Sequence, residues 1–275
     1  MPRVVLLAVA AVTAGVLAVP ALATQPSAGC STSPAGIATT CAGVGPGTFV
    51  AVDGGGGGCT LGFVLRAANR VTYVETAGHC AVPVGSGRHI WKAGHGPAVR
   101  LSSATQVPGG AAGGVIGHVV YAVQEKDNID DVDFAVIQLD RGIPTYTSVP
   151  YYGGPTGINV AISPDPQQLN LFGRPPALGD TIPARPLLAH NLSNRSHVFG
   201  TGPAAPGDSG APVLDQQGRA IGVLLGAGGN QVSAGTVGTP GDSHGGGVVR
   251  ILRLGPALEL ASGALHITLR LAIGT

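Results

Sequence analysis

Charged residues are scarce in this chain of 275 residues: they make up 11% of it, and the formal net charge is +1. A surface that attracts nucleic acid needs a clear excess of Lys and Arg, which the sequence lacks, so we expect no nucleic-acid partner. Long stretches with apolar residues at helical spacing are also missing, whereas Gly (46) and Pro (22) are abundant. This composition favours short strands joined by many turns, with little helix.

Patterns that hold metals or nucleotides are missing as well. No two cysteines stand in a C-x-x-C spacing, and none of the eight histidines belongs to an H-E-x-x-H motif. The sequence therefore predicts no metal ligand. The glycine run 54–58 lacks the Lys-Ser/Thr pair that grips phosphate and opens no helical pattern, so we interpret it as a flexible turn before a strand. We expect no cofactor.

The first residues carry an export pattern. Arg3 precedes an apolar run over 4–19, and residues 20–23 place small side chains at the two positions that a signal peptidase inspects. We predict a signal peptide over 1–23 and a secreted, extracellular protein without stable membrane insertion after cleavage. Two alternatives stay open. The apolar run approaches the ~20 residues of a retained membrane anchor, and the residues before Cys30 partly match a lipoprotein box.

Composition divides the rest of the chain into three parts. Residues 24–47 are rich in Ser, Thr, Gly, Pro and Ala, which predicts a flexible N-terminal arm or short pro-segment. β-Prone runs over 48–145 and 146–275 predict two β-barrels, with a linker at 141–155 and one short helix at 253–264. The strands expected are 49–52, 61–65, 71–75, 115–123 and 134–139, then 158–162, 211–214, 220–225 and 247–251.

Three short motifs supply the residue types that acyl transfer requires. They are Thr-Ala-Gly-His-Cys at 76–80, an aspartate at the start of the predicted strand 134–139, and Gly-Asp-Ser-Gly at 207–210. Acyl transfer to a serine needs a base beside the hydroxyl, a group that orients the base, and donors for the charge developing on the carbonyl oxygen. The order His, Asp, Ser differs from that of α/β-hydrolases, whose G-x-S-x-G motif is broken here by Ala211.

With these motifs the sequence resembles the chymotrypsin-like serine peptidases, and among them the bacterial streptogrisin-type proteases, over roughly residues 48–262. The segment Cys-Thr-Leu-Gly-Phe at 59–63 adds to the likeness, because a similar segment accompanies the histidine motif in those enzymes. The resemblance implies an all-β fold of two Greek-key six-stranded β-barrels with a short C-terminal helix. It also implies a secreted, monomeric serine endopeptidase that acts on proteins or peptides.

The resemblance assigns a catalytic role to each motif. Ser209 would be the nucleophile, His79 the general base and acid, and Asp133 the group that orients the imidazole. Asp130 and Asp131 are alternatives for the acid, but only Asp133 is followed by the apolar strand that follows the acid in the family. By the same resemblance, Asp208 would be a structural or activation-linked carboxylate and not a member of the triad.

The oxyanion hole and the disulfides also follow from the resemblance. The backbone N–H groups of Gly207 and Ser209 would form the oxyanion hole, and glycine suits the unusual dihedral angles of such a donor. The sequence by itself leaves three ways to pair four cysteines. The resemblance pairs the cysteines that flank the histidine site, leaving the other two for a second bond; the pairs are Cys59 with Cys80 and Cys30 with Cys41.

The expected substrate pocket carries no charge. The family often has a specificity residue six positions before the serine, which here is Pro203, followed by Ala204. Neither offers a counter-charge to a basic side chain, so we expect small or apolar residues before the scissile bond. The strand with Leu225 and Gly226 would form one wall of the cleft. Relatives have a serine near Leu225 and a disulfide in the second barrel, and this chain lacks both features. An alternative therefore stays open: an exported protease-fold binding protein with little or no turnover.

Overall fold

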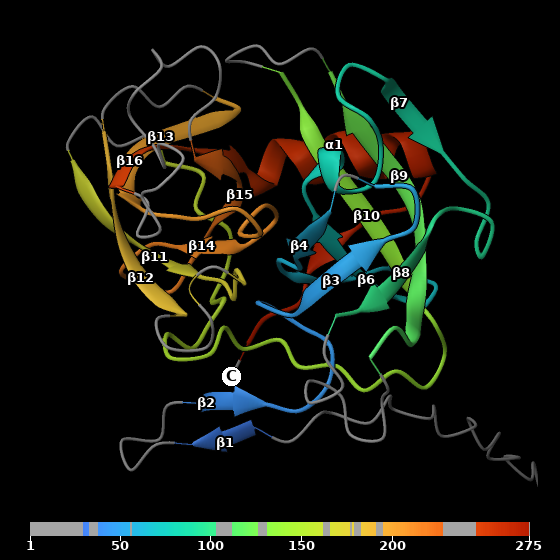
Figure 1. Cartoon of the computed structure of the whole chain (residues 1–275), viewed down its shortest axis with the longest axis horizontal. Coiled ribbons are helices and arrows are strands. Elements are labelled where there is room, and N and C mark those ends of the chain that lie inside the picture. The colour runs from blue at the N-terminus through green and yellow to red at the C-terminus, as the bar shows by residue number, and fades with distance from the viewer. Residues whose placement is uncertain are drawn as a thin grey trace, which may run out of the picture.

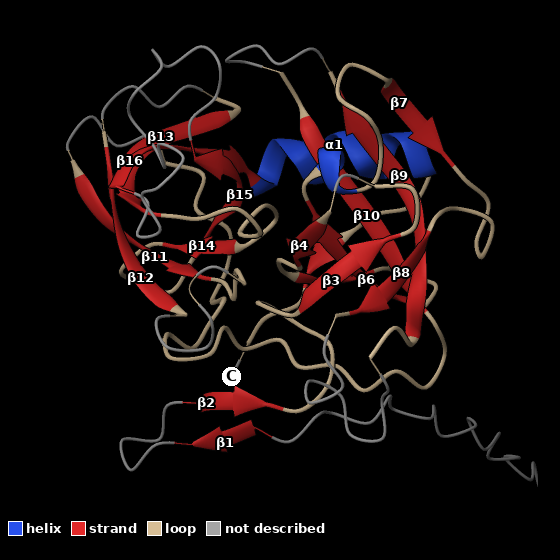
Figure 2. Cartoon of the chain, in the orientation of Figure 1, coloured by secondary structure: helices blue, strands red, loops and turns tan. Residues whose placement is uncertain are grey.

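A computed structural model describes residues 30–32, 38–55, 57–102, 112–125, 131–161, 166–176, 178, 183–190, 195–227 and 246–274. The main feature of the fold is a pair of large sheets that lie side by side (Figures 1 and 2). The helix α1 (Leu254–Leu265) contacts strands of both sheets. In the part of the chain that is described, no helix is long and apolar enough to cross a bilayer. The predicted signal peptide and Asp130 lie outside the described residues.

Nine strands form the first sheet. They are β3 (Phe49–Val52), β4 (Gly58–Thr60), β5 (Val64–Arg66), β6 (Thr72–Thr76), β7 (Gly87–Ile90), β8 (Ala98–Leu101), β9 (Val115–Gln124), β10 (Asp133–Leu139) and β17 (Arg270–Leu271). The order is β17-β5-β6-β10-β9-β8-β3-β4, and β7 pairs with β9. The step from β6 to β10 skips the intervening strands, as in a Greek key.

A bent segment connects strands near the two ends of this sheet. Its first half, β4, pairs with β3, and its second half, β5, pairs with β6. Between the halves, Leu61 donates to the Thr48 carbonyl at 2.8 Å and Gly62 donates to the Glu75 carbonyl at 2.8 Å. A side chain at Gly62 would place its Cβ 2.1 Å from the Glu75 carboxyl group. Glycine therefore lets the chain turn closely across β6, where the sequence predicted an uninterrupted strand over 61–65.

The second sheet is a closed barrel of six strands. They are β11 (Gln167–Phe172), β12 (Ala184–Ala189), β13 (His197–Pro203), β16 (Gly246–Arg253), β15 (Ala220–Ala227) and β14 (Pro212–Leu214), in that order around the barrel. The structure confirms the predicted all-β, double-barrel fold with a short C-terminal helix, although the first sheet has nine strands instead of the predicted six and forms a half-barrel. The helix occupies 254–265, and Gly255 and Pro256 lie in its first turn, where proline is tolerated.

Apolar side chains fill each barrel and the space between them. One buried cluster lies within the first barrel and includes Val74 and Ile137, and another lies within the second and includes Leu171 and Ile251. A third cluster joins residues of both barrels with α1, among them Phe134 and Leu258. The helix thus covers a shared core, which fixes the barrels against each other and places the site that lies between them.

The predicted strand over 158–162 is wrong for its described part, residues 158–161. Ile158 makes a single parallel bridge to Ala220, and Val160 is 84% exposed. Asn159 holds the segment instead: its side-chain amide donates to Asp215 at 2.7 Å, and its side-chain oxygen accepts from the Ala161 backbone N–H at 2.8 Å. Side-chain bonds of this kind replace a strand ladder.

Part of the predicted N-terminal arm is packed. The strands β1 (Cys30–Thr32) and β2 (Ala38–Cys41) form a separate hairpin that carries the Cys30–Cys41 disulfide. Residues 43–47 are buried, and Val44 forms a parallel bridge with Thr145 in the predicted linker. Burial of residues 43–47 means that packing against the barrels begins before Thr48, the predicted start of the first barrel.

Candidate active site

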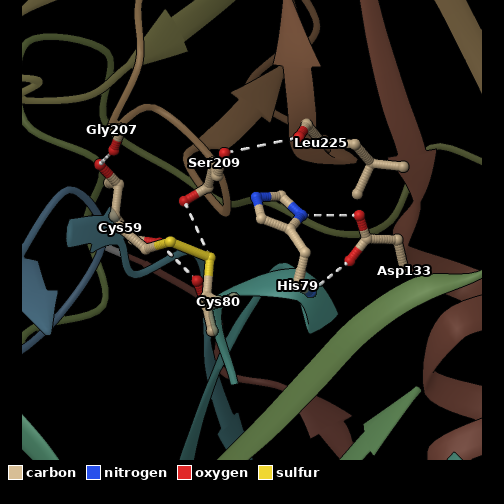
Figure 3. Close-up of a disulfide and its surroundings, with 9 residues drawn as sticks. Cys59, His79, Cys80, Asp133, Gly207, Ser209 and Leu225 are labelled. Carbon is tan, nitrogen blue, oxygen red and sulfur yellow. Dashed lines mark hydrogen bonds and ion pairs between the residues drawn. A yellow bond between two sulfur atoms is a disulfide. The ribbon is translucent and has the colours of Figure 1, made fainter. Parts of the chain in front are cut away.

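The residues of the three motifs meet between the barrels. His79 lies in the 3-10 helix η1 (Gly78–Cys80), which follows β6, and Asp133 is the first residue of β10. Ser209 lies in the turn before β14 in the second barrel. Figure 3 shows the imidazole of His79 between the Asp133 carboxylate and Ser209. The first barrel therefore supplies the predicted base and acid, and the second supplies the predicted nucleophile.

Two hydrogen bonds join His79 to Asp133. The imidazole Nδ1 lies 2.7 Å from Oδ2 of Asp133, and the backbone N–H of His79 donates to Oδ1 at 2.8 Å. The Asp133 side chain is 3% exposed and that of His79 is 27% exposed. Gly78 allows this approach, because a Cβ there would lie 2.0 Å from the Val123 carbonyl oxygen and 2.8 Å from the Phe134 nitrogen. The glycine of the histidine motif thus sets η1 directly against β9 and β10.

The first barrel holds the turn that carries Ser209. The Thr60 backbone N–H donates to the Ser209 carbonyl at 2.9 Å, and the Thr60 hydroxyl donates to the Gly207 carbonyl at 2.7 Å. Gly210 has a φ of +87°, and a Cβ there would lie 2.1 Å from the Thr76 hydroxyl oxygen. Glycine is therefore required after the serine so that the two barrels can approach each other.

The Ser209 hydroxyl lies within reach of two groups. It donates to the Leu225 carbonyl at 3.5 Å, a long hydrogen bond, and the imidazole lies beside it in Figure 3. Catalytic hydrogen bonds are often loose before substrate binds, so this arrangement is compatible with a serine nucleophile.

Two backbone N–H groups of this turn have no hydrogen-bond partner among the described residues. They belong to Gly207 and Ser209. Their neighbours are satisfied: Asp208 donates to the Ala205 carbonyl at 3.0 Å and Gly210 donates to the Leu224 carbonyl at 2.7 Å. Unpaired backbone donors are costly away from water, so two of them in one turn form a natural site for a negatively charged oxygen. Gly207 has a φ of +103°, which favours glycine.

A buried ion pair fixes the same turn. The guanidinium of Arg185 makes two bonds of 2.6 Å to the Asp208 carboxylate, and these side chains are 1% and 0% exposed. Asp208 also accepts from the Ala205 backbone N–H at 2.8 Å, and Arg185 donates to the Gly173 carbonyl at 3.2 Å. Sequence reasoning left Asp208 outside the triad but missed Arg185, whose only signal is its inward position in the alternating pattern of β12.

The residues expected to line a substrate pocket lie on strands next to this turn. Pro203 ends β13, Ala204 follows it and is buried, and Gly226 lies in β15. The structure brings the Leu225 carbonyl to the Ser209 hydroxyl, whereas the Leu225 side chain packs into the core between the barrels. Leu225 therefore contacts Ser209 with its backbone carbonyl and not with its side chain.

The disulfide beside the histidine is formed as the resemblance implied. Cys80 directly follows His79, and its sulfur is bonded to that of Cys59 (Figure 3). The Cys80 sulfur also lies 4.0 Å from the Ser209 carbonyl oxygen. A disulfide sulfur carries no proton, so this approach is a van der Waals contact rather than a hydrogen bond. The disulfide thus borders both the predicted base and the predicted nucleophile.

No protein-family model and no curated protein sequence matches this chain. Among solved structures, it is similar to a Nocardiopsis protease at 20% identity over 82% of this chain and 98% of that one, with a TM-score of 0.49. It is also similar to the inactive form of the Rv3671c protease at 14% identity over 78% of this chain and 88% of that one, with a TM-score of 0.43. A serine-to-alanine mutant of Rv3671c from M. tuberculosis is similar at 16% identity over 79% of this chain and 86% of that one, with a TM-score of 0.45.

Proposed function

We propose that this chain is a secreted serine endopeptidase that hydrolyses peptide bonds through an acyl-enzyme on Ser209. The observation that carries the proposal is the buried Asp133 carboxylate, bonded twice to His79, with Ser209 on the other side of the imidazole. A base, its orienting acid and a hydroxyl in this arrangement are what nucleophilic catalysis at a carbonyl requires.

In the proposed mechanism Ser209 attacks the scissile carbonyl while His79 takes its proton through Nε2. Asp133 keeps the Nδ1 proton in place and stabilises the imidazolium, because its carboxylate is 2.7 Å from Nδ1. His79 then passes its proton to the leaving amine. A water molecule, activated in the same way, hydrolyses the acyl-enzyme and frees Ser209.

The negative charge that develops on the carbonyl oxygen needs donors in the transition state. The N–H groups of Gly207 and Ser209 are the candidates, since both are unpaired among the described residues. Removing one such donor from a serine protease typically costs about 2.7–4 kcal/mol in the transition state. The Arg185–Asp208 pair and the Thr60 bonds support this role, because they hold the turn before substrate arrives.

The proposed enzyme prefers small or apolar residues before the scissile bond. Pro203 and Ala204 carry no charge, and Leu225 and Gly226 form the proposed wall of the cleft. A basic substrate side chain would lose its hydration without gaining a partner there.

Export through a signal peptide at residues 1–23 completes the proposal. Two disulfides, Cys30–Cys41 and Cys59–Cys80, suit an oxidising compartment. The Cys30 sulfur is bonded to Cys41 and so cannot also carry a lipid thioether, which disfavours the lipoprotein alternative. We propose a monomer with the first barrel over 48–145 and the second over 146–275, acting on proteins or peptides.

A second candidate is a protease-fold binding protein with little or no turnover. The bond between the Ser209 hydroxyl and the Leu225 carbonyl favours it, because a serine held there does not attack. The assembled His79–Asp133 pair favours the enzyme, since a binding surface needs no buried acid behind a histidine.

A peptide-library digest followed by mass spectrometry separates the two candidates. We expect the mature protein to cleave after small or apolar residues and the Ser209→Ala variant to lose cleavage. Ser102→Ala, at an exposed serine in the first barrel, is the matched control and should cleave like the parent. Absence of cleavage by the folded parent protein would favour the binding protein, and equal cleavage by Ser209→Ala would contradict Ser209 as the nucleophile.

A further inference from the structure

The disulfide next to His79 gathers three potential metal ligands. One atom each from Cys59, His79 and Cys80, two sulfurs and one imidazole nitrogen, lie within 4.8 Å of one another. This is the single group of three His, Cys, Asp or Glu ligands found among the described residues. While the disulfide is intact, its sulfurs are not thiolates and bind metals weakly.

We propose that reduction of the Cys59–Cys80 disulfide creates a Zn²⁺ site whose protein ligands are the two cysteine thiolates and the imidazole of His79. A dithiol reductant supplies two electrons and two protons: the protein disulfide becomes two thiols while the dithiol becomes a disulfide. The two thiols then lose their protons to solvent as the metal binds both sulfurs and the imidazole. The site requires nothing beyond this chain, the reductant and the cation.

The distances suit a tetrahedral metal. Zinc binds sulfur at about 2.3 Å and histidine nitrogen at about 2.0–2.1 Å. Tetrahedral angles then place the ligand atoms about 3.5–3.8 Å from one another. The three atoms already lie within 4.8 Å, so small side-chain movements suffice. A water molecule or another small ligand would complete the coordination.

The backbone keeps the two cysteines together without the disulfide. Cys59 lies in β4, where it is paired with Val50 of β3. Cys80 lies in η1 and donates to the Ala77 carbonyl at 3.2 Å. The Cα atoms of the two cysteines are 6.2 Å apart. Since both segments are fixed by their own hydrogen bonds, we expect the reduced thiols to stay adjacent.

Asp133 would act as the outer partner of the metal site. It lies 2.7 Å from Nδ1 of His79, so the metal would take Nε2. A carboxylate behind a metal-bound histidine fixes the ring and raises its basicity, and losing such a partner typically weakens binding about 10–100-fold. The site itself is independent of the proposed protease activity. The effect of metal binding on catalysis rests on that proposed activity: a metal on Nε2 would occupy the base and stop turnover.

Cobalt spectroscopy tests the site without using activity. The full-length mature protein is reduced with a phosphine, which becomes a phosphine oxide and does not compete as a thiol ligand, and is then titrated with Co²⁺. We expect one Co²⁺ per chain, with thiolate-to-cobalt charge-transfer bands and the ligand-field bands of a tetrahedral ion. Zn²⁺ should displace it. The oxidised protein should show none of these bands.

Variants assign the ligands. Cys30→Ser/Cys41→Ser keeps the proposed site and should retain the bands, whereas Cys59→Ser/Cys80→Ser should lose them. Because the second variant can unfold, Asp133→Asn gives an independent reading: it keeps both cysteines and should weaken Co²⁺ binding about 10–100-fold. Bands that persist in Cys59→Ser/Cys80→Ser, binding unchanged by Asp133→Asn, or a Cys59–Cys80 bond that the phosphine leaves intact in the folded protein would overturn the proposal. An oxidised, metal-free protein that shows no protease activity, but whose reduced form shows the bands, would contradict the protease proposal alone.

Discussion

The Asp133 carboxylate bonds to His79 through both of its oxygens, at 2.7 Å to the ring Nδ1 and at 2.8 Å to the backbone N–H. One bond orients the imidazole and the other fixes the backbone from which the imidazole projects. Because the carboxylate is almost fully buried, little water competes for these bonds. The position of the ring in front of Ser209 therefore depends on a single acid.

Replacing that acid should stop turnover. We expect Asp133→Asn to lower kcat by about 10,000-fold, because an amide in this position favours the wrong imidazole tautomer. Steady-state kinetics on a cleaved peptide measures the loss. Asp131→Asn, at the described alternative acid, is the matched control and should keep kcat close to the parent value. A larger loss in Asp131→Asn than in Asp133→Asn would reverse the assignment of the acid.

Breaking the ion pair beneath the nucleophile turn should destabilise the fold. Arg185→Met leaves the Asp208 carboxylate buried without its cation, which typically costs about 3–5 kcal/mol. Urea unfolding gives this value from the shift of the midpoint. Arg100→Ala removes an exposed pair with Asp53 and serves as the control, with an unfolding free energy close to that of the parent. Equal effects of the two substitutions would show that the buried pair has no special role.

A side chain at the proposed oxyanion donor should reduce catalysis more than substrate binding. In Gly207→Ala the new Cβ would lie 3.0 Å from Pro176 Cδ and 3.1 Å from Phe49 Cε2, at a φ of +103°. We expect the N–H group to move and kcat to fall by about 100- to 1,000-fold with a smaller change in KM. Gly85→Ala, at φ +75° with open space around it, should leave both constants near the parent values.

The buried Glu75 should make stability fall as the pH rises. Its carboxyl group is fully buried, Oε1 accepts from the Phe63 N–H at 2.5 Å, and Oε2 has no partner among the described residues. Burial raises the pKa of Glu75 well above its ordinary value. The folded state therefore holds this proton more tightly than the unfolded chain, so the stabilisation is complete below about pH 4.3 and is lost as the pH rises through the folded-state pKa.

Glu75→Gln isolates this effect because glutamine stays neutral. We expect the variant to become more stable relative to the parent as the pH rises above about 4.3, which thermal unfolding at a series of pH values would measure. A difference in stability that stays constant from pH 4 to 8 would contradict the assignment of a protonated Glu75.

The motifs identified residues that the fold brings together, whereas the search for strands missed several strands of the two sheets. That His79, Asp133 and Ser209 lie close together could be expected, because each lies beside a glycine or an apolar strand that the geometry needs, as Gly78 and Gly210 illustrate. The roles of Thr60 and Arg185 could not be expected, since they arise from contacts between distant segments. Arg185 meets Asp208 across 23 residues of sequence, and no local pattern links them.

Strands that carry proline or polar residues escaped prediction for a related reason. β12 alternates inward and outward positions, but Pro186 and Arg185 hide that alternation from a search for apolar runs. β11 is similar, with Gln and Asn among its leucines. Conversely, the largely apolar run at 158–162 was predicted to be a strand, but the Asn159 side chain donates to Asp215 and holds the described part of the segment outside a ladder. Pairing with neighbours, rather than local propensity, decides these segments.

Covalent labelling by a fluorophosphonate tests the central claim most directly, because the probe reacts with a serine only when a base has activated it. The folded mature protein should take up one label per chain, which peptide mapping by mass spectrometry should locate on Ser209. Ser209→Ala should take up none, and Asp133→Asn should react much more slowly. Folded parent protein that remains unlabelled, or a label on another serine, would contradict the proposal that His79 and Asp133 activate Ser209.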